Sequence, residues 1–167
     1  VAFDSNNVNV TYGDVVGNYD TIYVVDFKES DDAVISNNNI VADGKTYIYG
    51  IQISGEDFII RANNISSTGV YYANGIDIEG PATGVIYGNE IHAAGINSAY
   101  PIYSGMNGKD VSVNYTNNDL YGEAYYVVGM SLGDVESLIE ENDISLDGNY
   151  TTGIAFNGAQ INIAHNN

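Results

Sequence analysis

The stretch that decides the fold is VYYANGIDIEGPATGVIYGNEI, residues 70–91. It contains two short phrases. One is a glycine followed by apolar-x-apolar, as in Gly75-Ile76-Asp77-Ile78, and the other is Asn-x-Ile, as in Asn89-Glu90-Ile91. Both phrases return along the chain at a nearly fixed distance. A period of about two dozen residues indicates a repeat architecture, so the repeat takes precedence over local propensity.

The Asn-x-apolar phrase sets the period. Successive asparagines are 25, 26, 29, 24 and 24 residues apart, and they are Asn38, Asn63, Asn89, Asn118, Asn142 and Asn166. The apolar-x-apolar phrase follows each of the first five, 12 or 13 residues later. If each repeat forms one coil of the chain, a single coil cannot bury its own apolar face, whereas stacked coils share a core. The pattern therefore predicts an all-β parallel solenoid of about six to seven coils with 24–29 residues each.

The repeat covers most of the chain. We expect a single domain over residues 1–167, with an irregular first coil at 1–32 and regular coils at 33–167. Residues 22–27 are predicted to supply the second strand of the first coil. Residues 134–141 have a helix-like composition, but the repeat places a strand there, and tertiary context overrides local propensity.

Two residue types recur in register. The asparagines are expected to stack as a ladder of amide hydrogen bonds and to supply the left-handed conformation that sharp corners need. Four tyrosines each precede the glycine of the second phrase by three residues, and they are Tyr47, Tyr72, Tyr126 and Tyr150. They predict a stripe of stacked rings. The alternative is an exposed stripe that binds sugar rings.

Composition excludes several classes of partner. The net charge of −18 repels nucleic acid and anionic membranes, and no apolar run is long enough to cross a bilayer. The chain has no cysteine, so thiolate chemistry and disulfides are excluded. Four Asn-x-Ser/Thr sequons favour an exported, extracellular protein with glycosylation candidates at Asn9, Asn64, Asn114 and Asn149.

Few residues in the sequence suggest a catalytic or metal-binding site. Asp77 and Glu79 flank Ile78 and are expected to face outward together, without a second carboxylate pair on the neighbouring coils to build a catalytic cleft. No cofactor is predicted, and calcium is the one ion left open. Its weak candidates lie in acidic turns that are otherwise simply solvated, and they are Asp31, Asp32, Asp143 and Asp147.

One insertion interrupts the frame. It is rich in turn residues and consists of Ser104, Gly105, Met106, Asn107, Gly108, Lys109 and Asp110. Because loops on rigid scaffolds often carry function, we expect this segment to be a lateral contact or binding loop.

The repeated Gly-Ile-x-Ile and Asn-x-Ile phrases, as in 75–78 and 89–91, resemble the right-handed parallel β-helix repeats of the pectin-lyase-like superfamily. The abundance of Asn and Tyr and the acidity are most similar to adhesin-like surface proteins of methanogenic archaea. The resemblance implies right-handed winding and a cell-surface location. Polysaccharide-cleaving members use clustered Asp with Arg, Lys or His, but Arg61 is alone here, so no catalytic residue is carried over.

These observations predict a non-enzymatic extracellular structural protein, such as an adhesin, coat or fibre subunit. A solenoid with raw ends exposes strand edges and an open core. We therefore expect its partners to be further copies of itself, stacked head to tail into a filament, or flanking solenoid coils, with surface glycans as another partner. The alternative is a carbohydrate-binding or polysaccharide-degrading β-helix module.

Overall fold

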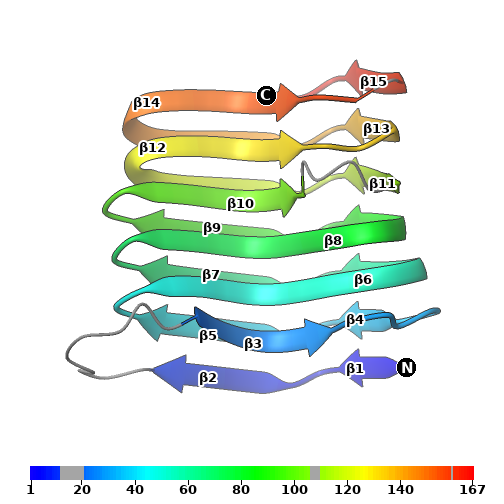
Figure 1. The fold of residues 1–167 in the computed structure, drawn as a ribbon, viewed down its shortest axis with the longest axis horizontal. Coiled ribbons are helices and arrows are strands. Elements are labelled where there is room, and N and C mark those ends of the chain that lie inside the picture. The colour runs from blue at the N-terminus through cyan, green and yellow to red at the C-terminus, as the bar shows by residue number, and fades with distance from the viewer. Residues whose placement is uncertain (12–20, 106–109, 159) are drawn as a thin grey trace.

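The computed structural model describes residues 1–11, 21–105, 110–158 and 160–167. These residues form an all-β parallel solenoid of about five turns, without a helix. Front strands run left to right and back strands right to left while the chain climbs, so the winding is right-handed (Figure 1). The predicted fold class is confirmed. The prediction of six to seven coils exceeds the observed number of about five, because it counted the incomplete coils at both ends.

Fifteen strands belong to one continuous sheet in the described part of the chain. Their bounds are β1 (Ala2–Asp4), β2 (Asn7–Thr11), β3 (Thr21–Phe27), β4 (Val34–Ser36), β5 (Asn39–Gly44), β6 (Tyr47–Arg61), β7 (Asn64–Gly69), β8 (Tyr72–Tyr87), β9 (Glu90–Gly95), β10 (Ser98–Ser104), β11 (Val111–Thr116), β12 (Asp119–Leu132), β13 (Glu136–Glu140), β14 (Asp143–Phe156) and β15 (Gln160–Ala164). The strands expected at 22–27 and within 134–141 are both present, as β3 and β13.

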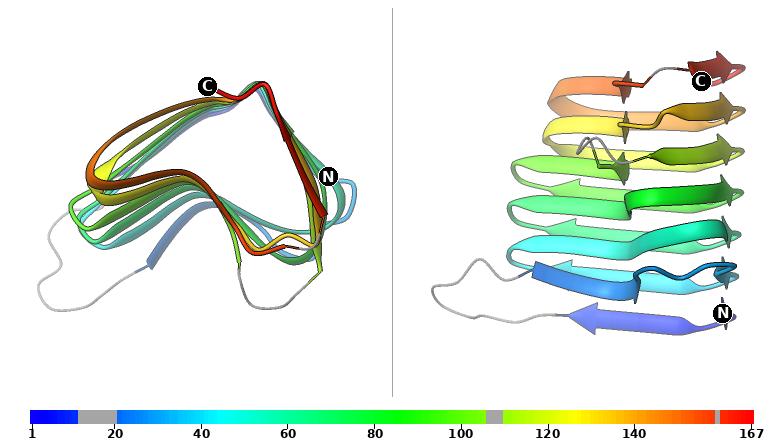
Figure 2. Two further views of the ribbon diagram at one scale, coloured as in Figure 1. Left: turned by 90° about the horizontal axis from the view of Figure 1, so that it is seen from above. Right: turned by 45° about the vertical axis from the view of Figure 1, so that its right-hand side comes forward.

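Each coil has three walls, seen end-on in Figure 2. The front wall contains β3, β10 and parts of β6, β8, β12 and β14, and its strands pair in parallel from coil to coil. The back wall contains β2, β5, β7, β9 and the first parts of β12 and β14. The remaining strands, with the last parts of β6 and β8, form the third wall.

The core consists of apolar columns, one residue per coil. In the third wall, register pairs place seven side chains in one column, Phe3, Ile35, Ile60, Ile86, Tyr115, Ile139 and Ile163. The five in the middle of this column are fully buried. Alternation along the strand turns these residues inward and their neighbours outward.

The glycine of the second phrase has a packing reason. The front wall bends toward the back wall (Figure 2), and at this bend a Cβ on Gly75 would overlap with Cγ2 of Ile91. A Cβ on Gly50 would lie 2.7 Å from Cγ2 of Ile65. At these two positions the walls approach so closely that a side chain would clash. The outer side of the front wall is consequently concave, and it is called the concave face below.

Candidate functional site on the concave face

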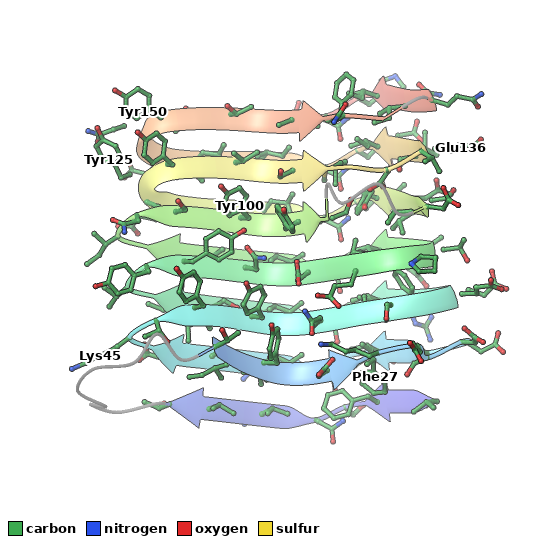
Figure 3. All side chains as sticks on the ribbon, viewed as in Figure 1. Phe27, Lys45, Tyr100, Tyr125, Glu136 and Tyr150 are labelled. Carbon is green, nitrogen blue, oxygen red and sulfur yellow. The ribbon has the colours of Figure 1, made fainter. Side chains whose placement is uncertain are left out.

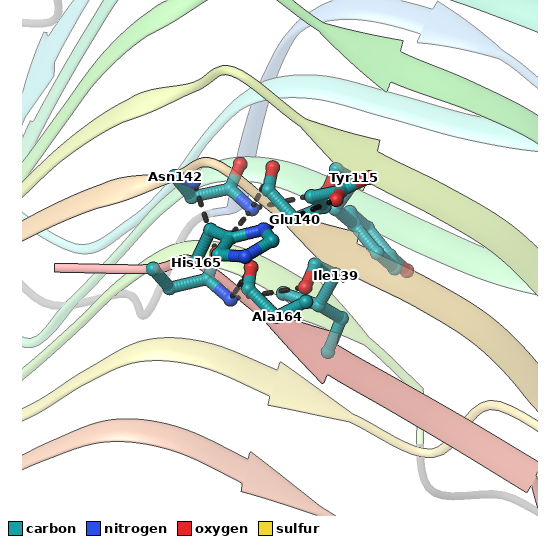
Figure 4. Close-up of polar contacts among 7 residues, drawn as sticks. Tyr115, Ile139, Glu140, Asn142, Ala164 and His165 are labelled. Carbon is teal, nitrogen blue, oxygen red and sulfur yellow. Dashed lines mark hydrogen bonds and ion pairs between the residues drawn. The ribbon is translucent and has the colours of Figure 1, made fainter.

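The predicted asparagines lie in one column, which is buried from Asn38 to Asn142 and partly buried at Asn166. The side chain of Asn89 donates to Oδ1 of Asn118 at 3.0 Å and to the carbonyl oxygen of Ile60 at 3.0 Å, while its own Oδ1 accepts from Asn63. The pattern repeats in Figure 4, where Asn142 donates to the carbonyl oxygens of Tyr115 and Glu140. The ladder satisfies the backbone groups that the corner removes from the sheet.

The ladder contains one asparagine that the sequence frame did not include. Asn6 donates from its backbone and side chain to Oδ1 of Asn38, at 2.9 and 3.1 Å. The phrase Asn6-x-Val8 suggests the start of the first coil in the sequence, but its spacing of 32 residues to Asn38 departs from the regular period because the first coil is longer than the others.

The expectation that the ladder asparagines are left-handed is wrong. The left-handed residue is the one before each ladder asparagine, as at Asn37 (φ 56°), Ala62 (φ 52°) and Glu141 (φ 56°). The asparagine itself must turn its amide into the corner to cap carbonyl groups, so its predecessor makes the turn. The position accepts Ala and Glu at a cost of about 1–2 kcal/mol per residue.

The other predicted sites lie on the surface. All four sequon asparagines are exposed, at Asn9, Asn64, Asn114 and Asn149. The four calcium candidates are exposed too, and within the described ranges no three or more His, Asp or Glu side chains are grouped to hold a metal ion. Among the same residues no helix has the length and apolar character needed to span a membrane.

The predicted contact loop is described only in part. Its residues 106–109 lie outside the described residues. Ser104 ends β10 and is fully buried, where its hydroxyl donates to Asp134 and accepts from the backbone N–H of Gly133 at 3.1 Å. Asp110, at the other end, is exposed.

Asp134 is a buried carboxylate that the sequence did not reveal. It accepts hydrogen bonds from Ser104, from Ser137 at 2.5 Å and from the Tyr115 hydroxyl at 2.9 Å. Burial raises the pKa of Asp134, and the three donors oppose that rise. Tyr115 occupies a column position that isoleucine fills in the neighbouring coils, and this exception was the available signal. Since Asp134 is fully enclosed, its role is structural.

The concave face carries a ladder of tyrosine rings (Figure 3). Ring centroids lie 4.8 Å apart from Tyr23 to Tyr49, 6.1 Å from Tyr49 to Tyr72 and 5.0 Å from Tyr72 to Tyr100. Tyr103 meets Tyr100 edge-on at 5.6 Å. Burial raises the pKa of the Tyr72 hydroxyl above its ordinary value, so the ring stays neutral.

A second aromatic group lies higher on the same wall. Tyr126 and Tyr150 stack at 5.0 Å with an interplanar angle of 16°, and Tyr125 meets both rings edge-on. All three are well exposed. The four tyrosines predicted to share a stripe therefore divide, because Tyr47 contacts Tyr72 at 6.0 Å in the first group while Tyr126 and Tyr150 belong to the second.

Beside the tyrosines lies a polar cluster. The Gln52 side-chain nitrogen donates to Asp77 at 3.0 Å and to Glu79 at 3.2 Å, and it brings the two predicted outward carboxylates onto one donor. Asn74 donates to Asp77 at 3.4 Å. Asp77 faces outward as predicted, but it is only 6% exposed because the concave bend covers it. Burial raises the pKa of Asp77 to about 6, and the charge of Glu79 adds to that rise.

The cluster has unfilled hydrogen-bonding capacity. Oε1 of Gln52 and Oδ1 of Asn74 are buried and accept no hydrogen bond. Leaving a buried acceptor unpaired costs about 1–3 kcal/mol. The cluster adjoins a hollow of about 420 Å³ lined by Lys28, Glu29, Asp31, Ser54, Gly55, Glu56, Glu79, Gly80 and Pro81. The rings and the polar cluster, with the hollow beside Glu79, make this face the best candidate for a binding site in the described part of the chain.

Comparison with known proteins adds no assignment. No protein family matches the chain, and neither the curated proteins nor the solved structures contain a significant match. The parallel solenoid is therefore established by the coordinates themselves, while the superfamily resemblance remains a prediction.

Proposed function

We propose that this chain is a non-enzymatic structural unit of an extracellular surface protein, in which β-coils stack head to tail into a longer rod. The observation that carries the proposal is the character of the two end faces. Both expose apolar core positions and carry opposite ends of the asparagine ladder.

The top end leaves core columns uncovered. Ile163 continues a column that is fully buried at Ile139, yet it is 44% exposed. Phe156 pairs with fully buried Leu132 and is 56% exposed. At the bottom end, β1 and β2 alternate between partly buried and exposed residues only. Another coil on either face would bury this apolar area at a gain of about 25 cal/mol per Å².

The ladder gives the two ends complementary polarity. Each ladder asparagine donates its backbone N–H to the side-chain Oδ1 of the next asparagine, as Asn142 does to Asn166 at 2.9 Å. The bottom coil thus presents the unfilled acceptor Oδ1 of Asn6, and the top coil presents the backbone donor of Asn166. Donor meets acceptor when a second copy stacks in the same direction, which is a head-to-tail contact that propagates.

Charge favours contact at the ends over contact at the sides. The chain carries 22 acidic and four basic residues, so the sides of two rods repel each other. The four sequon asparagines are exposed, where glycans would further separate neighbouring rods. An acidic rod with apolar ends suits a surface filament or a long adhesin stalk.

Sedimentation velocity and negative-stain electron microscopy of the purified chain at increasing concentration test the proposal. We expect the sedimentation coefficient to rise with concentration and the micrographs to show rods longer than one unit, which is roughly 30 Å. The isolated chain has the same raw faces whether flanking coils come from the same polypeptide or from another copy, so it should self-associate in either case.

A pair of variants locates the contact. Ile163→Glu places a charge on the top end face and should abolish self-association. Ile96→Glu places the same charge on a lateral corner, where Ile96 is already 66% exposed, and should change nothing. A chain that stays monomeric at every concentration, or that associates equally well with Ile163→Glu, overturns the proposal.

A further inference from the structure

The tyrosine ladder of the concave face does not continue into the upper coils. At Asn74, which pairs with Tyr49 and Tyr100 in register, the ring of Tyr72 leans across and contacts both neighbouring rings. One coil above Tyr100 the register places Val128, and no described ring leans across there. The exposed rings of β12 and β14 therefore belong to a different surface from the ladder.

That surface lies at the corner where the back wall turns into the front wall. Tyr125, Tyr126 and Tyr150 come from two adjacent coils, and Figure 3 shows Tyr125 and Tyr150 at this corner. Ile96 lies in the coil below, where its carbonyl oxygen accepts from the backbone N–H of Tyr125 at 3.1 Å. The four side chains are between 43% and 66% exposed. Together they form one apolar strip along the edge of the rod, which is called the corner strip below.

Two open hollows lie beside Ile96. One, of about 340 Å³, is lined by Ile96, Glu123, Tyr125 and Asp147 among others. The other, of about 250 Å³, shares Ile96 and Glu123 with the first and also includes Val70. Pockets for small molecules measure about 300–1,000 Å³ and enclose most of their ligand. Hollows this small and open suit single side chains of a partner protein rather than an enclosed small molecule.

Two carboxylates line these hollows without a cation beside them. Glu123 and Asp147 pair in register on adjacent coils, and both are exposed. Neither takes part in a hydrogen bond or an ion pair with another described residue. Like charges that face each other on neighbouring strands are destabilising, so a cation placed between them would be favourable. An exposed apolar strip with such an acidic rim indicates an interface for a partner of opposite charge.

We propose that the corner strip binds a cationic, apolar segment of another protein. Large apolar side chains of that segment would pack on Ile96 and the three tyrosines, and its Lys or Arg side chains would pair with Glu123 and Asp147. Tyrosine is among the residues that contribute most to binding at protein interfaces. A second copy of this chain does not fit, because its 22 acidic and four basic residues would bring like charge to the rim. The proposal is independent of whether the end faces stack.

Binding is measured with the full chain, produced in a host without N-glycosylation because the sequon residue Asn149 lines the larger hollow. The probe is a synthetic amphipathic peptide of leucine and lysine that carries one tryptophan. Since the chain has no tryptophan, the emission of the peptide reports binding directly. A matched peptide keeps the tryptophan and every lysine but has serine in place of leucine. At physiological ionic strength we expect the leucine peptide to bind at least about tenfold more tightly than the serine peptide.

A pair of ring variants locates the apolar contact. Tyr126→Ser removes a ring of the corner strip and should weaken binding of the leucine peptide about tenfold, equivalent to about 1.4 kcal/mol. Tyr121→Ser removes a ring of similar exposure from the same strand, but on the back wall, where Tyr121 pairs with His92. It should leave affinity within about twofold.

A pair of double variants separates local charge pairing from overall attraction. Glu123→Gln with Asp147→Asn removes the two rim charges and should weaken binding about tenfold. Asp119→Asn with Asp143→Asn removes two exposed charges that pair in register in the same two strands, at the opposite edge of the back wall. Both double variants change the net charge equally, so only the first should lose more than about twofold in affinity.

Far-ultraviolet circular dichroism shows that each variant is folded. The proposal is overturned if the leucine peptide does not bind at millimolar concentration, or if the serine peptide binds as tightly. It is also overturned if the two members of either variant pair lose affinity equally, because the peptide would then bind elsewhere on the chain or by net charge alone.

Discussion

The asparagine corner and the concave face are built from the same repeat but are satisfied to different degrees. At the corner, each buried amide has every donor and acceptor engaged, and the pattern runs unchanged from Asn38 to Asn142. On the concave face, Gln52 and Asn74 keep unpaired oxygens and the tyrosine ladder stops at Tyr100. Uniform columns hold the solenoid together, whereas departures from uniformity leave buried groups unpaired.

The largest expected effect on stability comes from removing an asparagine of the buried ladder at the corner. Asn89→Ala leaves the carbonyl oxygens of Ile60 and Tyr87 and the donors of Asn63 unpaired in the core. We expect a loss of at least about 3 kcal/mol in the free energy of unfolding, measured by urea denaturation. Asn39→Ala is the control, because Asn39 makes the same kind of amide contact with Asn7 but on the exposed surface. Equal effects of both substitutions would contradict a structural role for burial of the ladder.

A substitution in the polar cluster on the concave face should instead increase the stability of the fold at neutral pH. Burial raises the pKa of Asp77 to about 6 in the folded chain, against 3.8 for an ordinary Asp carboxyl, so the folded state holds the proton more tightly. The stability of the unmodified chain therefore falls as pH rises from about 4 to 6. Asp77→Asn does not titrate, and we expect it to be more stable than the unmodified chain at pH 7 by on the order of 2 kcal/mol.

Thermal unfolding between pH 3 and about pH 8 measures this difference. It should shrink as pH falls toward 4 and vanish below about pH 3, where Asp77 is protonated in both states. Asp119→Asn, an exposed change in β12, serves as the control and should show no comparable gain. A gain that does not depend on pH would refute the assignment to Asp77.

A smaller effect is expected at the left-handed corner position. Ala62 has φ of 52°, a conformation that glycine adopts without strain. Ala62→Gly should stabilise the solenoid by about 1 kcal/mol, because relief of the left-handed strain exceeds the entropy cost of glycine. Ala73→Gly, at a buried position inside β8, should destabilise it. Chemical denaturation of the two variants side by side distinguishes the positions.

The smallest effect is expected from completing the tyrosine ladder. Val128→Tyr adds a ring next to Tyr100 and should stabilise the fold by about 0.5–1.5 kcal/mol, the value of one aromatic pair. A change in near-ultraviolet circular dichroism would report the new stacking. A strong loss of stability instead would mean that the position has no room for a ring.

Much of the fold was predictable because the period of the sequence repeat equals the length of one coil of the solenoid. Residues one coil apart pair in register, so Asn63 and Asn89, or Ile60 and Ile86, could be placed side by side from spacing alone. The strand at β13 was predicted against local helix propensity for the same reason. The candidate site was predictable only as two separate features, a stripe of tyrosines and an outward carboxylate pair.

The sequence by itself determined the columns, since alternation and period fix which side chains point inward and which ones stack. Only the tertiary structure decided how deeply the outward side chains of a column are buried and how its rings are oriented. It showed that Asp77 is buried although it points outward, because the front wall bends toward the back. It also showed that Tyr72 leans across to repair the ladder at Asn74 while nothing does so at Val128. Curvature and ring orientation arise from packing between walls, and no spacing along one chain encodes them.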